Sequence, residues 1–326
     1  MPVEDGVRRE YGLTRCGWHA VPWIRRLALC ILTGLWLAGS LSAQAAQVAV
    51  VLSDDSAPYQ EVFQVIRAHL DDSGHLAAPS YAANPDKLDA ARLVVAVGVR
   101  AAEVVGASAS RAPVLAVLVP RVWFLRTGRA LLTEDGRRSV SAIFIDQPFE
   151  RQAALIRLAF PDARRVGVLV TRDHAATLDE LEPALRNAQL ALVPARVDAG
   201  ERLIAPLENV LREADVLLAV PDPQVFNRNT AQSLFLTSYR YRDPVVGYSR
   251  SLTRAGALLS LHSSPAQIGR QAAEWIRQAL SGGAVRLPAA AYPAYFSVSI
   301  NDQVGRSLGF TLPPANTLEA GLGATR

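Results

Sequence analysis

The chain has 326 residues, half of them apolar, and a net charge of +4 at neutral pH. This size suffices for two α/β domains, and a charged fraction of 20% excludes a largely disordered chain. The sequence contains no basic block and no stripe of interleaved basic and aromatic residues, so it predicts no nucleic-acid binding.

The N-terminal region has the pattern of a secretory signal peptide. The basic pair Arg25 and Arg26 precedes a mainly apolar run over residues 27–41, and small residues follow up to Ala45. This order predicts a cleavable signal peptide over residues 1–45 and a periplasmic location. An uncleaved membrane anchor is the alternative, although the apolar run is short for a membrane span.

Both cysteines, Cys16 and Cys30, fall in the segment that is predicted to be removed. The exported chain then contains no disulfide, no thiolate metal site and no cysteine nucleophile. The few histidines are scattered along the sequence. We therefore predict no cofactor and no metal site.

Short apolar runs alternate with helix-like segments from residue 47 onward. Continuous apolar runs are typical of parallel strands that helices cover on both faces, and repeated β-α-β units predict such sheets. The series breaks near residues 145–147, which predicts two separate sheets. The predicted strands are residues 48–52, 93–97, 114–119, 166–170, 216–220, 245–246 and 257–261.

Several helix starts carry chemical signals. Ser264 and Gln267 form a capping-box pattern around a proline, Pro148 can open a second helix, and Asp222 can cap a third that runs towards Tyr239. Residues 121–138 are the least periodic stretch, and we expect them to form a long excursion over the first sheet.

Polar and aromatic residues follow the ends of the predicted strands. Ligands of open parallel sheets bind beyond the carboxyl ends of the strands, and solute sites combine apolar walls with a few polar groups. The predicted ligand-binding residues are Ser53, Asp54, Asp55, Tyr59, Gly98, Arg100, Arg121, Trp123, Thr171, Arg172, Asp222, Gln224, Tyr248, Ser249 and His262.

The four strand-end arginines leave two interpretations open. If two or more of Arg100, Arg121, Arg172 and Arg250 face one cleft, they favour an anionic ligand such as a carboxylate or phosphate. Equally, these positions are exposed in any such fold, and the whole chain is rich in arginine.

Other candidates have structural alternatives. Asp54, Asp55 and Asp222 can be helix caps instead of ligand contacts. Trp123 can stack on a ligand or pack its loop onto the sheet, and His262 can be a purely structural histidine. His69, His75 and His174 are expected at the surface, and Phe124 is expected to pack inward.

The sequence lacks the common catalytic motifs, so we predict that the protein is not an enzyme. There is no G-x-S-x-G, no H-E-x-x-H and no P-loop, and Gly98 is followed by no further glycine before Gly106, which excludes a dinucleotide fingerprint. A catalytic site assembled from distant residues is the remaining alternative.

Several segments together resemble the ABC-transporter substrate-binding family with the type I periplasmic-binding-protein fold. The resemblance is strong over residues 146–313 and looser over 47–145. It rests on DQPFERQ at 146–152, FPDARRVGVL at 160–169, DVLLAVPDP at 215–223, DPVVGYS at 243–249, RAGALLS at 254–260, SPAQIGRQAAE at 264–274, YFSVSIN at 295–301 and RSLGF at 306–310.

The resemblance implies two doubly wound α/β lobes joined by three crossovers, near Asp146, Ser251 and Tyr292, with a ligand cleft between them. Lobe 1 would comprise residues 46–146 and 252–291, which includes the capped helix from Pro265. Lobe 2 would comprise residues 147–251 and 292–326.

The resemblance also implies a monomer that delivers a small organic ligand, anionic or amino-acid-like, to an inner-membrane ABC permease. A periplasmic sensing subunit with the same fold is the alternative function. The sequence departs from the family in the loop at 120–124, PRVWF, where small polar residues and an Asp are usual, and at Val99, where a hydroxyl is usual.

Overall fold

The computed structural model describes residues 48–70, 79–85, 88–133, 136, 138–198 and 202–323. The predicted signal peptide, both cysteines and His75 lie outside the described residues. The chain from Ala46 onward forms one compact unit. Among the described helices, none combines the length and the apolarity needed to cross a membrane.

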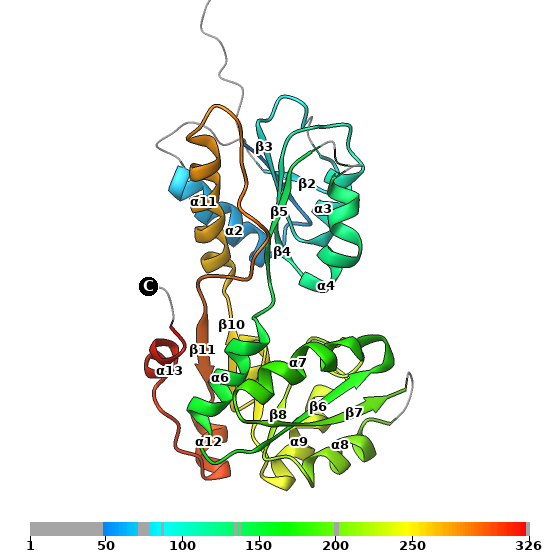
Figure 1. Ribbon diagram of the computed structural model, residues 1–326, viewed down its shortest axis with the longest axis vertical. Coiled ribbons are helices and arrows are strands. Elements are labelled where there is room, and N and C mark those ends of the chain that lie inside the picture. The colour runs from blue at the N-terminus through cyan, green and yellow to red at the C-terminus, as the bar shows by residue number, and fades with distance from the viewer. Residues whose placement is uncertain are drawn as a thin grey trace, which may run out of the picture. The chain divides into compact units, whose positions relative to one another are not determined.

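The first sheet has five parallel strands (Figure 1). Its order is β2 (Ser80–Tyr81), β1 (Val48–Leu52), β3 (Leu93–Val97), β4 (Val114–Val119) and β5 (Val140–Phe144). Strands β3 and β4 are buried along their whole length, as their unbroken apolar runs predict.

Helices cover both faces of this sheet. On one face α2 (Ala57–Leu70) packs with α11 (Pro265–Leu280), although the two helices are far apart in sequence (Figure 1). Helix α3 (Val99–Gly106) covers the other face. The predicted capping box of α11 is confirmed: Gln267 N donates to Ser264 Oγ at 3.2 Å, and Ser264 N donates to the Gln267 side chain at 2.8 Å.

The excursion after β4 is helical rather than irregular. It contains α4 (Arg121–Trp123), the wider helical turn η2 (Phe124–Gly128) and α5 (Arg129–Thr133). The buried side chains of Phe124 and Leu132 anchor it to the sheet. These two anchors are too few and too unevenly spaced to give the apolar periodicity that would have predicted a helix.

The second sheet has six strands, of which β11 alone among them runs antiparallel to its neighbour. Its order is β11 (Ser297–Ile300), β10 (Leu259–His262), β9 (Val245–Gly247), β8 (Val216–Leu218), β6 (Arg165–Thr171) and β7 (Ala191–Val197). The prediction of two mostly parallel α/β sheets is therefore confirmed.

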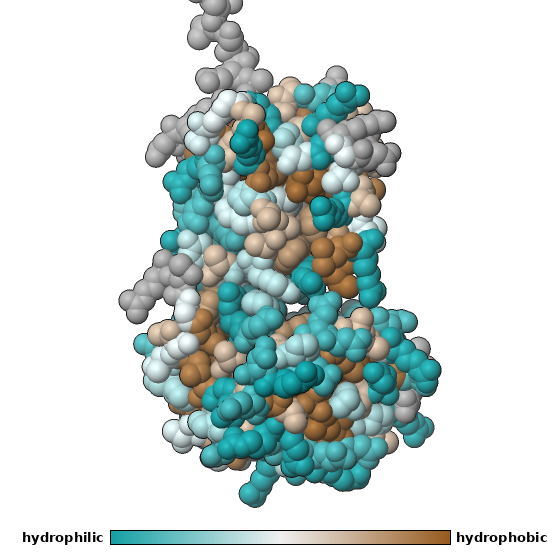
Figure 2. All heavy atoms as spheres, in the orientation of Figure 1, coloured by the Kyte–Doolittle hydropathy of each residue, from teal (hydrophilic) through white to brown (hydrophobic). Residues whose placement is uncertain are grey.

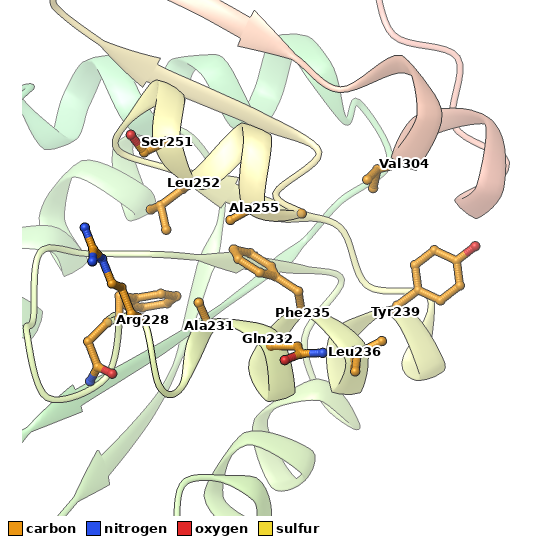
Figure 3. Close-up of a pocket in the computed structure, with 13 residues that line it drawn as sticks. Arg228, Ala231, Gln232, Phe235, Leu236, Tyr239, Ser251, Leu252, Ala255 and Val304 are labelled. Atoms are coloured by element: carbon orange, nitrogen blue, oxygen red, sulfur yellow. The ribbon is translucent and has the colours of Figure 1, made fainter.

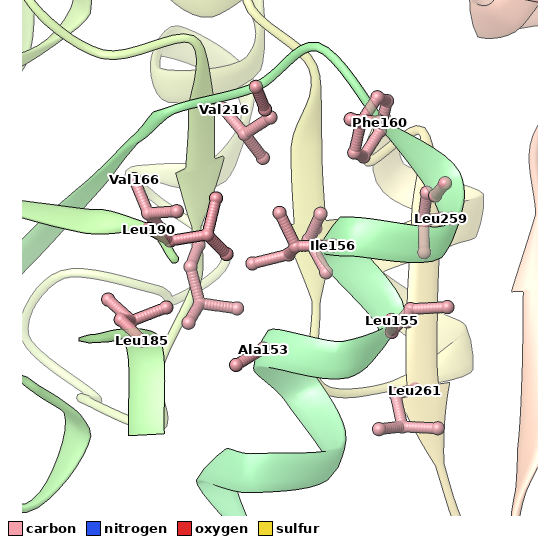
Figure 4. Packing of buried hydrophobic residues seen from close by; sticks show 14 of the residues in the cluster. Ala153, Leu155, Ile156, Phe160, Val166, Leu185, Leu190, Val216, Leu259 and Leu261 are labelled. Atoms are coloured by element: carbon pink, nitrogen blue, oxygen red, sulfur yellow. The ribbon is translucent and has the colours of Figure 1, made fainter. Parts of the chain in front are cut away.

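Two apolar clusters flank the second sheet. The larger one, drawn in Figure 4, includes Leu155 and Ile156 of α6 and Leu185 of α7. The other joins α8 to α9 on the opposite face. The helices and the short turn of this part are α6 (Phe149–Ala159), η3 (Arg172–His174), α7 (Ala176–Asn187), α8 (Ile204–Leu211), α9 (Ala231–Tyr241), α10 (Arg250–Ala255), α12 (Asp302–Leu308) and α13 (Ala315–Gly321).

The chain passes between the two sheets three times. The first passage follows β5 and the third precedes β11, close to the predicted Asp146 and Tyr292. The second passage lies between β10 and α11, not near Ser251 as predicted. Strand β10 pairs with β9 and β11, so residues 252–262 belong with the second sheet. Pairing with neighbouring strands decides which sheet a strand joins, and the apolar run in the sequence does not encode this pairing.

A further correction concerns the helix expected to open at Asp222. Residues 223–230 form turns, and α9 begins only at Ala231. Asn227 organises these turns, because its side-chain oxygen accepts from Asn229 N at 2.9 Å and its amide donates to Pro223 O at 2.9 Å. A polar side chain that bonds the local backbone in this way favours a turn over a helix.

Two carboxylates lie next to the strand starts of the second sheet. Asp215 accepts from Arg164 N and Arg165 N, both at 2.8 Å, and these bonds outweigh burial, so the pKa of Asp215 is lowered. Burial, with the nearby charge of Asp215, raises the pKa of Asp243 to about 7. Among the described residues, one oxygen of Asp243 has no hydrogen-bond partner.

Replacing Asp243 by Asn is expected to stabilise the protein in a pH-dependent way. Because the pKa of Asp243 is raised to about 7 in the folded protein, ionisation opposes folding increasingly as pH rises from the ordinary value of 3.8. Thermal melts should therefore place Asp243→Asn above the wild type at about pH 8, with a smaller gap at about pH 5. The exposed Asp162→Asn variant is the control, and a gap independent of pH would contradict the assignment.

Truncation of Ile156 tests the core of the second sheet. Ile156 is fully buried in the cluster of Figure 4, so Ile156→Ala is expected to lower the free energy of unfolding by about 2–5 kcal/mol. Urea denaturation measures this loss. Leu158→Ala on the same helix removes an exposed side chain and should cost distinctly less; equal losses would place the core elsewhere.

Candidate functional site

The loop after β1 is held to the start of α3 by Ser53. Its hydroxyl donates to Val97 O at 2.9 Å and accepts from Ala101 N at 3.1 Å. Gly98 has φ +87°, and a Cβ there would lie 2.4 Å from Ser53 Oγ and 2.8 Å from the Tyr59 ring. The predicted residues Ser53, Tyr59 and Gly98 thus come together, but the Ser53 hydroxyl is used inside the scaffold.

The neighbouring charged residues lie at the surface. Asp54 accepts from Ser56 N at 2.9 Å in the turn before α2, and hydrogen bonds from Ser56 lower the pKa of Asp54. Asp55 and Arg100 are exposed at the same edge of the sheet. Asp54 therefore serves the turn, whereas Asp55 and Arg100 present their charges to solvent.

Arg121 connects the first sheet to the second. Its backbone N–H donates to Asp146 Oδ2 at 2.6 Å, and its guanidinium donates to Glu180 Oε2 of α7 at 2.6 Å and lies 5.9 Å from the centre of the Tyr292 ring. Burial raises the pKa of Asp146, which the bond from Arg121 opposes. The loop after β4, two of the three passages and α7 thus meet at one arginine.

The ring of Trp123 packs against the protein. It is half-buried, and the space beside its ring exists because residue 128 is glycine: a Cβ at Gly128 would lie 2.4 Å from the ring. Phe124 is buried, as predicted. Trp123 therefore packs beside Gly128, and part of its surface stays accessible.

Asp222 links the ends of β6 and β8. This side chain is fully buried, and its oxygens accept from Thr171 N at 2.7 Å, Thr171 Oγ1 at 2.8 Å and Gln224 N at 3.0 Å. His174 Nδ1 lies 3.4 Å from the same carboxylate. The side chain of His174 is 31% exposed, so this residue lies partly at the surface. Asp222 is a structural clamp with no accessible surface for a ligand.

The loop after β9 also has a packing role. The ring of Tyr248 meets that of Phe226 edge-on at 6.3 Å, and burial, with the charge of Asp222, raises the pKa of the Tyr248 hydroxyl. Ser249 caps α10 by accepting from Leu252 N at 3.2 Å.

His262 ends β10 beside the second passage. A ring nitrogen of His262 is 2.8 Å from Ser299 Oγ, and burial, with the charge of Arg250, lowers the pKa of the ring. Gln147 donates to Ser263 Oγ at 2.8 Å, which ties the first passage to the second.

A model of the ABC transporter substrate binding protein family matches residues 79–320. The chain belongs to this family. Family members bind substrates, and the resemblance found in the sequence is confirmed. A search of curated proteins finds no match to the sequence.

Solved structures share the fold. A conserved domain protein from Vibrio cholerae is 19% identical over 86% of this chain and 99% of its own, with a TM-score of 0.57. An ABC domain from Streptococcus pneumonia in complex with L-Trp is 16% identical with the same coverage and TM-score. The ligand-free, open substrate-binding protein with adhesive properties from Clostridium difficile is 14% identical over 82% of this chain and 95% of its own, with a TM-score of 0.66.

The four strand-end arginines fall into two groups. Arg121 and Arg172 form ion pairs: Arg121 with Glu180, and Arg172 with Asp198, with 3.1 Å between Nη2 and Oδ2. Within the residues that the structure describes, Arg100 and Arg250 form no ion pair. Of these four arginines, Arg100 and Arg250 therefore keep their charge available for an anionic ligand.

The sequence prediction omitted the residues that join the sheets. Glu180 lies inside a helix, where nothing in the pattern distinguishes it from other surface acids. Gln147 and Ser263 lie at passages, and Ser299 lies in β11, so none of them directly follows the end of a predicted strand. Of these four residues, only Gln147 lies next to a predicted crossover, the one at Asp146. In the described ranges, no group of three or more His, Cys, Asp or Glu side chains is placed to hold a metal ion.

Asp222→Asn is expected to lower stability by about 1–3 kcal/mol, because the amide cannot accept all the buried hydrogen bonds that now converge on the carboxylate. Chemical denaturation measures the loss of stability, and the m-value is expected to stay unchanged. The exposed Asp173→Asn is the matched control. Unchanged stability of Asp222→Asn would show that Asp222 is not a structural clamp.

Proposed function

We propose that this family member is a periplasmic binding protein that takes up a small organic solute between its two sheets and delivers it to an inner-membrane ABC permease. The match to the substrate-binding family over residues 79–320 carries the proposal. The signal-peptide pattern before residue 46 supports export. Lobe 1 then comprises residues 46–146 and 264–291, and lobe 2 comprises residues 147–263 and 292–326.

Contacts between the sheets support a site at their carboxyl ends. Arg121 follows β4 and pairs with Glu180 of α7, while Gln147 and Ser263 join the passages after β5 and β10. The carboxyl ends of strands from both sheets are therefore close together. Ligands of open parallel sheets bind at such ends.

The side chains left for a ligand suggest its chemical class. Val122, Leu125 and Ile145, each about half exposed, follow the carboxyl ends of β4 and β5. Arg100 and Arg250 supply charge from the two lobes. A solute with an apolar body and one carboxylate, such as an apolar amino acid, fits both features. The neighbour from Streptococcus pneumonia, described in complex with L-Trp, agrees with this class.

A thermal-shift screen of the chain from Ala46 tests the function. Amino acids, other carboxylates, phosphates, sugars and nucleosides form the panel. A ligand at about 100 times its Kd should add roughly 2.7 kcal/mol of stability, and we expect the strongest shifts from apolar amino acids or carboxylates. Arg250→Gln should reduce the shift, whereas Arg277→Gln, an exposed charge on α11, should not.

A flat response of folded, ligand-free protein to the whole panel would contradict solute capture and favour a sensing role through protein contacts. Turnover of a bound compound would contradict a pure binding function. An equal loss in Arg250→Gln and Arg277→Gln would remove the arginine from the ligand site.

A further inference from the structure

The second lobe carries an open groove that shares no lining residue with the predicted ligand site. It lies between α9, α10 and the first turn of α12 and has a volume of about 580 Å³ (Figure 3). This volume is in the range of small-molecule sites, roughly 300–1,000 Å³. The groove is thus large enough for a second ligand.

The walls of the groove are mainly apolar. Phe235 and Leu252 line it from α9 and α10 (Figure 3). Phe235 packs closely against Gly256, since a Cβ there would lie 2.9 Å from the Phe235 ring. On the rim, Leu236 and Tyr239 leave 58% and 45% of their surface exposed. Large apolar side chains gathered at an open surface indicate a binding site.

Among the described residues that line the groove, Arg228 is the one with a charged side chain. Asp302 in the first turn of α12 does not line the groove, and Arg240 of α9 is paired with Glu208. Arg228 lines the groove and, within the described part of the chain, forms no ion pair. Figure 3 shows Arg228 and Ser251 on one side of the groove, and Tyr239 and Val304 on the other. The groove therefore has a cationic, hydrogen-bonding end and an apolar end.

We infer that this groove binds an anionic amphiphile, a molecule with one acidic head group and an apolar chain. The head lies by Arg228 and Ser251, where a guanidinium and a hydroxyl can both donate to its oxygens. The chain lies along Phe235 and Leu252 towards Tyr239. A neutral or cationic head would forgo the charge interaction, so the groove discriminates by charge.

Two sources can supply such a molecule: a free carboxylate such as a fatty acid, or an anionic lipid at a membrane surface. Dodecanoate below its micelle concentration is the probe for the first source, with dodecyltrimethylammonium as the matched cation. Vesicles of phosphatidylglycerol, compared with vesicles of phosphatidylcholine, are the probe for the second source.

Calorimetric titration of the purified protein should show dodecanoate binding at least tenfold more tightly than the cation. Arg228→Gln should weaken dodecanoate binding about tenfold, as expected for loss of a charged hydrogen bond. Ala255→Trp, at an exposed position on the groove wall, should abolish binding by filling the space. Arg254→Gln removes an exposed charge from α10 that does not line the groove, and it should bind like the wild type.

The outcomes separate the sources. Binding of dodecanoate that Ala255→Trp abolishes supports a free amphiphile, and co-sedimentation with phosphatidylglycerol vesicles that the same variant abolishes supports a membrane lipid. Absence of both overturns the inference and leaves the groove to a protein partner. Equal effects of Arg228→Gln and Arg254→Gln, or binding unaffected by Ala255→Trp, overturn it too. None of these outcomes depends on the solute site, because an interlobe ligand found in the screen should bind Ala255→Trp normally.

Discussion

The hydrogen bond from Arg121 N to Asp146 positions the residue that links the two lobes most directly. It fixes the loop after β4 against the first passage of the chain, and that placement directs the guanidinium to Glu180 on the second lobe. The same guanidinium lies by Tyr292 on the third passage. One residue therefore couples a strand end, two connections and a helix of the opposite lobe, which explains why an arginine at a predicted ligand position is engaged within the protein.

Many of the polar groups at the strand ends form hydrogen bonds within the protein itself. Buried or capping hydrogen bonds, which strand-to-helix turns require, are made by Ser53, Thr171, Asp222 and Ser249. Exposed arginines, the exposed carboxylate of Asp55 and apolar surface remain at these edges. This division separates residues that build the site from residues that are free to contact a solute, and it shifts the expected ligand towards an apolar body with a single charge.

The fold could largely be predicted from the sequence. Strands β1, β3 and β4 have the predicted bounds, because a strand buried on both faces needs an unbroken apolar run. Strand β7 was missed because it lies at the sheet edge, and its partly exposed residues interrupt the apolar signal. Strand β10 was recognised but placed with the wrong sheet, since pairing with β11 depends on residues distant in sequence.

The site was less predictable than the fold. Sequence order shows which residues follow a strand, but not which side chain its neighbours will occupy. The Arg121–Glu180 pair joins residues from separate lobes, and the Asp222–Thr171 bond spans two strands that are not consecutive in sequence. Such pairs form only after the sheets have assembled, so a single sequence carries little local trace of them.

The passages between the lobes have a mechanical consequence. Phe144 N donates to Ala291 O at 3.0 Å, so the third passage runs hydrogen-bonded along the end of β5, and Gln147 ties the first passage to the second through Ser263. The three connections are therefore held side by side by hydrogen bonds. A movement of one lobe against the other must displace the three connections together, as in a hinge motion.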